Sequence, residues 1–208
     1  MCCAALAAVP MVGNATLIVN GGFDNNTTGW TGTYQAISAP TTITTGSYYY
    51  AGQVATNRIT QTYDLTPANL SAFGLTFDMS ADLFGFRTQQ DSSIFAAEFY
   101  DGLGGTGTLL SRVILNSQDG DPGDWGAAIV AGSPPSFQST SGLVDASTLS
   151  IIFAVESTRV QSSANDGYVD NAFFDLNAIA APNPVPLPGT LLLGAFGLIG
   201  FRLLRKAK

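Results

Sequence analysis

The sequence contains no histidine and few charged side chains. Of its 208 residues, 11% are Asp, Glu, Lys or Arg, and 46% are hydrophobic. Without histidine the chain cannot build Ser-His or Cys-His nucleophile pairs or His-ligated zinc sites. Ample apolar content with little charge is not typical of a disordered chain. We therefore expect one globular body that is not an enzyme of these classes.

Lysine is absent from the middle of the chain. Residues 16–184 hold all 15 acidic residues and only four arginines, a formal charge of −11. The other four cations lie in the last seven residues. An acidic body repels a phosphate backbone, so we expect no nucleic-acid partner. The basic tip is suited to the anionic face of a membrane.

Cysteine occurs only at Cys2 and Cys3, within an apolar, uncharged first segment, residues 1–15. Small residues at Gly13 and Ala15 fit the −3 and −1 positions of a signal-peptidase site, which predicts a signal peptide over this segment. Because a basic start is missing, two alternatives stay open. Translation begins further upstream, or the segment is a buried apolar strand.

The last 24 residues, 185–208, combine a Pro-x-Pro motif, an apolar run and a basic tip. The run 187–204 is 18 residues long, at the short end of what spans a bilayer. With Arg202 close to its end, it predicts a transmembrane helix with a cytoplasmic C-terminus and the body outside. The alternative is an amphipathic helix of the core.

This tail resembles the PEP-CTERM sorting signal of bacterial envelope proteins. Its motif residues are Val185, Pro186, Leu187 and Pro188, with Leu187 where the family usually has Glu, and its terminal cations are Arg202, Arg205, Lys206 and Lys208. The resemblance implies a location in the cell envelope, contact with membrane lipid, and processing by an exosortase. Residues 178–184 then form a linker between the body and the sorting signal.

The pattern of residues 16–177 predicts an all-β domain. Apolar and polar residues alternate in short runs such as 59–65, 75–79 and 95–99, and these runs end at Gly, Asn, Asp, Ser or Pro. About eight strands at this spacing indicate two packed sheets.

The ends of this domain carry a second resemblance. The opening run Leu17-Ile-Val-Asn-Gly-Gly-Phe-Asp24, followed by Gly29-Trp30, and the closing run Gly167-Tyr-Val-Asp-Asn-Ala-Phe-Phe174 resemble those of galactose-binding-like jelly rolls, the architecture of many carbohydrate-binding modules. The resemblance implies a two-sheet jelly-roll sandwich with its first and last strands side by side. It also implies a structural calcium ion held by Asp24, Asp170 and the carbonyl of Asn20. Alternatively, Asp24 caps a turn and Asp170 lies on a solvated strand face.

Aromatic residues are the candidate contacts for a sugar, namely Tyr48, Tyr49, Tyr50 and Trp125. Three consecutive tyrosines in a strand place rings on both faces, so we expect at least one to be exposed. Trp30, the other tryptophan, is expected in the core.

These features predict a non-enzymatic envelope or extracellular-matrix protein that displays a β-sandwich and associates with surface polysaccharide. The alternative is a carbohydrate-binding module with a defined glycan ligand. A third hypothesis is a glycoside hydrolase. It requires Glu98 and Glu156, the only glutamates, to face each other across a cleft.

Overall fold

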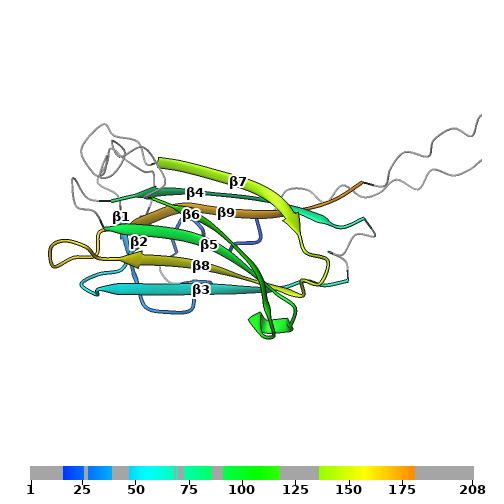
Figure 1. The fold of residues 1–208 in the computed structure, drawn as a ribbon. Coiled ribbons are helices and arrows are strands. Elements are labelled where there is room, and N and C mark those ends of the chain that lie inside the picture. The colour runs from blue at the N-terminus through cyan, green and yellow to red at the C-terminus, as the bar shows by residue number, and fades with distance from the viewer. Residues whose placement is uncertain are drawn as a thin grey trace, which may run out of the picture.

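The computed structural model describes residues 16–25, 28–38, 47–67, 69, 73–85, 91–117 and 136–180. These residues form two antiparallel sheets and a short 3-10 turn at Leu103–Gly105 (Figure 1). The strands are β1 (Gln35–Ser38), β2 (Ser47–Tyr50), β3 (Thr56–Asp64), β4 (Leu75–Phe84), β5 (Ser92–Tyr100), β6 (Leu109–Asn116), β7 (Ser136–Val144), β8 (Ser150–Thr158) and β9 (Tyr168–Ala178). The predicted all-β sandwich is confirmed.

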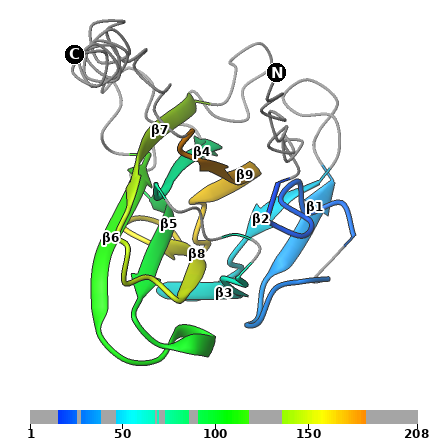
Figure 2. The ribbon, with the colours of Figure 1, turned by 90° about the vertical axis from the view of Figure 1, so that its right-hand side faces the viewer.

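The two sheets face each other, as Figure 2 shows in a view roughly along the strands. Five strands in the order β1-β2-β9-β4-β7 make one sheet, and four in the order β3-β8-β5-β6 make the other. Because the chain crosses repeatedly between the sheets from β2 onward, neighbours within a sheet are mostly distant in sequence. This is the connectivity of a jelly roll.

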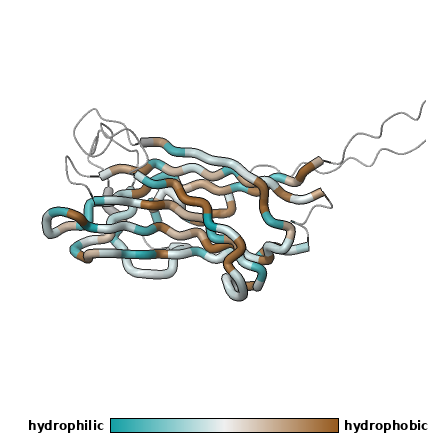
Figure 3. The backbone as a smooth tube through the Cα atoms, viewed as in Figure 1, coloured by the Kyte–Doolittle hydropathy of each residue, from teal (hydrophilic) through white to brown (hydrophobic). Residues whose placement is uncertain are grey.

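Alternation along each strand builds the core. On β5, Phe95, Ala97 and Phe99 point inward and are buried. Figure 3 shows the resulting change between hydrophilic and hydrophobic residues along the strands. The ring centres of Phe153 and Phe174, one from each sheet, lie 4.8 Å apart. Burying an aromatic side chain of this size contributes roughly 2–3 kcal/mol, so such rings hold the two sheets together.

The first described segment runs beside the last strand, as the jelly-roll resemblance implied. The amide of Leu17 donates to the carbonyl of Phe174 at 2.8 Å, and the amide of Ala172 donates to the carbonyl of Gly21 at 3.0 Å. A Cβ at Gly21 would lie 2.0 Å from the carbonyl oxygen of Ala172. Only glycine therefore allows this close approach.

Several predicted segments lie outside the described residues, namely residues 1–15, Trp125 and residues 185–208. Within the described ranges, no helix is long and apolar enough to cross a membrane. Strand β9 continues through Ala178, which is the first residue of the predicted linker.

Candidate functional site

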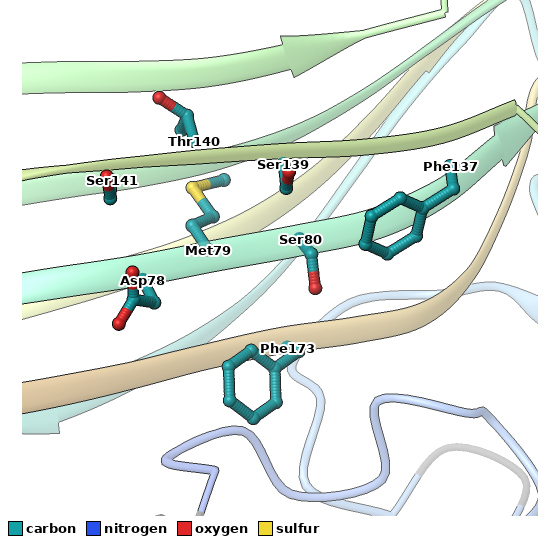
Figure 4. Close-up of a pocket in the computed structure, with 8 residues that line it drawn as sticks. All are labelled: Asp78, Met79, Ser80, Phe137, Ser139, Thr140, Ser141 and Phe173. Carbon is teal, nitrogen blue, oxygen red and sulfur yellow. The ribbon is translucent and has the colours of Figure 1, made fainter.

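A shallow groove of about 360 Å³ lies on the outer face of the five-stranded sheet (Figure 4). It is formed by β4, β7 and β9, and its lining residues are Asp78, Met79, Ser80, Phe137, Ser139, Thr140, Ser141 and Phe173.

The strand register explains why these side chains meet. On β4, Phe77 and Met79 point into the core, so Asp78 and Ser80 point outward. Ser80 pairs with Ser139 on one side and with Phe173 on the other. The three residues therefore form a row across β7, β4 and β9.

The ring of Phe173 forms one end of this row, and a second ring, that of Phe137, lies beside it. Phe137 pairs with Asp82, two positions further along β4, and 67% of its surface is exposed. In Figure 4 Ser80 lies between the rings of Phe137 and Phe173. An exposed phenylalanine beside a second, partly exposed ring offers two flat apolar surfaces that the core does not use.

Polar groups lie between and beside the rings. Each serine hydroxyl can donate one hydrogen bond and accept two, and the Asp78 carboxylate accepts only. The Nδ2 of Asn177 donates to Oδ2 of Asp78 at 2.9 Å, which fixes the orientation of this carboxylate. Flat apolar surfaces combined with a few oriented polar groups are typical of small-molecule sites.

The sequence analysis did not identify Phe137 or Phe173. One signal was available for Phe173, because adjacent phenylalanines in a strand must point to opposite faces. Phe174 points into the core, so its neighbour lies on the outer face. Phe137 has no comparable signal, because its strand has too few apolar residues to show which face is buried.

The predicted tyrosine contacts are mostly buried, which corrects the sequence prediction. Tyr49 is fully buried in the core, with its hydroxyl 3.0 Å from that of Ser157, and burial raises its pKa. Tyr48 is buried against Phe84 and Tyr168 on the outer side of the sheet. Neither ring can stack on a ligand in solution. Tyr50 remains partly exposed.

The predicted calcium ligands Asp24 and Asp170 approach the same point from two segments. A Cβ placed on Gly22 would lie 3.5 Å from Oδ2 of Asp24 and 3.9 Å from Oδ1 of Asp170. Only 2% of Asp170 is exposed, and this burial, together with the charges of Asp82 and Asp24, raises its pKa to about 7. The negative charges of Asp82 and Asp24 near the buried Asp170 would be stabilised by a cation, and carboxylate oxygens are ligands that calcium prefers.

The third predicted ligand, Asn20, has another role. Its carbonyl oxygen accepts hydrogen bonds from the amide of Phe23 and from Nε1 of Trp30, both at 3.2 Å. A carbonyl has two lone pairs, so both are engaged here, and a role for this oxygen as a calcium ligand stays a prediction. Asn20 is a turn residue with φ of 57°. Over the described ranges, no three His, Cys, Asp or Glu side chains gather closely enough to hold a metal ion.

The two glutamates do meet, on the outer face of the four-stranded sheet, but two arginines join them. Arg58 contacts both, with Nη2 at 2.8 Å from Oε2 of Glu98. Arg112 also contacts both, with Nη2 at 2.7 Å from Oε2 of Glu156 and Nε at 3.1 Å from Oε1 of Glu98.

This ion network does not suit glycoside hydrolysis. Burial raises the pKa of Glu98, but the hydrogen bonds and charge of Arg58, with smaller effects of Tyr100 and Arg112, outweigh it and hold the pKa below its ordinary value. A glycosidase needs one carboxyl whose pKa is raised so that it can donate a proton. Glu98 is therefore not such an acid.

Comparisons with known proteins identify similar folds but no family for this chain. The chain matches no family model and no curated protein. The enzymatically active domain of tailspike protein 4 of bacteriophage CBA120 is similar, with a TM-score of 0.52, 13% identity, and coverage of 78% of this chain and 21% of that chain. This chain therefore spans about a fifth of the tailspike structure, and the likeness shows a shared β-sandwich.

Two further solved structures resemble the chain more loosely. TmCBM61, solved with β-1,4-galactotriose, has a TM-score of 0.45 and 11% identity, covering 79% of this chain and 99% of that chain. A family 16 carbohydrate-binding module has a TM-score of 0.49 and 16% identity, covering 76% and 98%.

Proposed function

We propose that this chain is a non-catalytic glycan-binding module whose outer groove on the five-stranded sheet holds a sugar chain. The observation that carries the proposal is the pair of rings, Phe137 and Phe173, with the hydroxyl group of Ser80 between them. A pyranose has an apolar C–H face and an edge of hydroxyl groups. Its face stacks on a phenyl ring, while its edge exchanges hydrogen bonds with Ser80, Ser139 and Asp78.

The test compares the two ring variants with a matched control. Phe137→Ala and Phe173→Ala should each weaken binding about five- to tenfold, because an aromatic contact in a binding site contributes more than about 1 kcal/mol. Leu143 lies on β7 with its side chain outward, is 74% exposed and does not line the groove. Leu143→Ala should therefore leave binding unchanged.

Affinity electrophoresis against a panel of soluble neutral polysaccharides, followed by calorimetry with the best ligand, measures these changes. Equal affinity of wild type and both ring variants for the best ligand would overturn the groove as the binding site. Retention of no polysaccharide by the wild type would overturn glycan binding itself.

A location outside the cytoplasm is a second part of the proposal, and the sequence alone supports it. The first 15 residues would direct export, and residues 185–208 would hold the body at the membrane until an exosortase-type enzyme cleaves the tail. The displayed module would then contact extracellular polysaccharide. Intact masses of the cell-associated and released protein test both cleavages. A full-length mass in the soluble cell interior would overturn this part.

We also propose a structural calcium ion between Asp24 and Asp170. The convergence of these carboxyls near Gly22 and the raised pKa of Asp170 support it. Amide, backbone or water oxygens would complete the coordination. The ion would join the first segment to β9 and so stabilise the fold, without taking part in sugar binding.

A further inference from the structure

We infer that the groove selects glycans by charge: it takes uncharged sugar chains and excludes chains that carry uronate groups. This inference rests on the proposed function, since it names the class of glycan that the same groove would bind. Its basis is the distribution of charged side chains over the two outer faces of the sandwich.

The groove lies on an acidic face. Asp78 lines it, and Asp82 lies opposite Phe137 in the β4–β7 register. On β9, Asp175 pairs with Asp78, and Asp170 pairs with Asp82. Asp175 and Asp170 are buried, so the acidic charge that a ligand meets beside the rings comes from Asp78 and Asp82.

No described cation lies on this face. Arg58 and Arg112 are held by the glutamates on the outer face of the other sheet. Arg159 donates to the carbonyls of Gln53 and Ser163.

The hydrogen-bonding groups of the groove also favour a neutral sugar over an anionic one. Carboxylates only accept, so the ligand must donate to them, and the hydroxyl groups of a neutral sugar do so. The carboxylate of a uronate offers only acceptors where a neutral sugar has a hydroxyl group, and it brings a negative charge next to Asp78. Sites that bind carboxylates use arginine or lysine, and the described residues of the groove include neither.

The test uses neutral polysaccharides and their own C6-oxidised forms. Galactan, glucomannan and mixed-linkage β-glucan are each oxidised at C6, so that the linkage stays the same and only the C6 group changes, from a neutral hydroxymethyl group to a carboxylate. Binding of wild type is measured by affinity electrophoresis and calorimetry in chelator, because a divalent cation could bridge two carboxylates. Low salt is compared with about 0.5 M salt, which screens exposed charges.

For the neutral polymer that binds best, we expect the oxidised form to bind about tenfold more weakly at low salt. High salt should bring the affinities for the neutral and the oxidised polymer closer together. The double variant Asp78→Asn with Asp82→Asn should also bring the two affinities closer together, whereas Asp64→Asn, exposed at the end of β3 in the other sheet, should not.

Three results would overturn the inference in different ways. Equal or tighter binding of the oxidised form by the wild type overturns charge selection and leaves the proposed function standing. A low-salt ratio that stays the same in the double variant overturns the assignment of selection to these aspartates. Binding of neither form overturns both the inference and the proposed function.

Discussion

The buried carboxyl of Asp170 should make the fold less stable as the pH rises. Its folded pKa is about 7, against an ordinary value of 3.8, because burial disfavours the anion and Asp82 and Asp24 add negative charge nearby. Between these two values the folded chain holds a proton that the unfolded chain has lost. Stability from this group is therefore present below about pH 4 and is lost as the pH rises through about 7.

The size of the effect follows from the shift. One pKa unit corresponds to about 1.4 kcal/mol, so roughly three units give a ceiling of about 4 kcal/mol. In Asp170→Asn the side-chain oxygen can still accept from the amide of Asn171, as Oδ1 of Asp170 does at 2.7 Å, but the charge is gone. Without divalent cations, this variant should exceed wild type by up to about 4 kcal/mol near pH 8, and by little near pH 4.

Urea unfolding followed by the fluorescence of Trp30, which is buried, measures these differences at several pH values in chelator. Asp78→Asn is the control, because that carboxylate is exposed on the neighbouring strand. A difference between Asp170→Asn and wild type that stays constant from about pH 4 to 8 would refute the reasoning. So would a wild type that is the more stable of the two near pH 8 in chelator.

Three other changes test the structure. Calcium at about 100 times its dissociation constant should stabilise wild type by about 2.7 kcal/mol near pH 8 and leave Asp170→Asn unchanged; an unchanged melting temperature of wild type would remove the site. Gly21→Ala should cost at least about 2 kcal/mol in urea unfolding, because the new Cβ meets the carbonyl of Ala172, whereas Gly104→Ala, with open space but φ of 67°, should cost about 1 kcal/mol. Equal costs would contradict the close approach. Glu98→Gln should cost about 1–2 kcal/mol by the same assay, since it removes the charged acceptor of a partly exposed ion network, and no loss would show that the network adds nothing.

The strands were predictable because their signal is local. A period of two in the sequence shows directly which side chains share a face, and Phe95, Ala97 and Phe99 are buried together as expected. The same pattern placed Glu98 on a wet face, yet this side chain is buried. Arg58, from β3, closes over it, and no feature within β5 reports that neighbour.

The candidate site was less predictable, because exposure depends on what the other strands place alongside. Tyr48 points away from the core, but Phe84 and Tyr168 from β4 and β9 cover it. Phe137 lies in a strand rich in serine and threonine, where nothing covers its ring. Aromatic residues in sequence therefore indicated possible sugar contacts, while the sheet order decided which rings are free.

The two outer faces of the sandwich differ in how their charges are used, and this difference favours a single binding face. On the four-stranded sheet, Arg58 and Arg112 are paired with both glutamates, so a ligand that recruited either guanidinium would first have to break ion pairs. On the five-stranded sheet, the groove beside Asp78 has no described cation and two rings that the core leaves unused. A ligand gains contacts there without breaking an ion pair, provided that it brings hydroxyl donors and no negative charge.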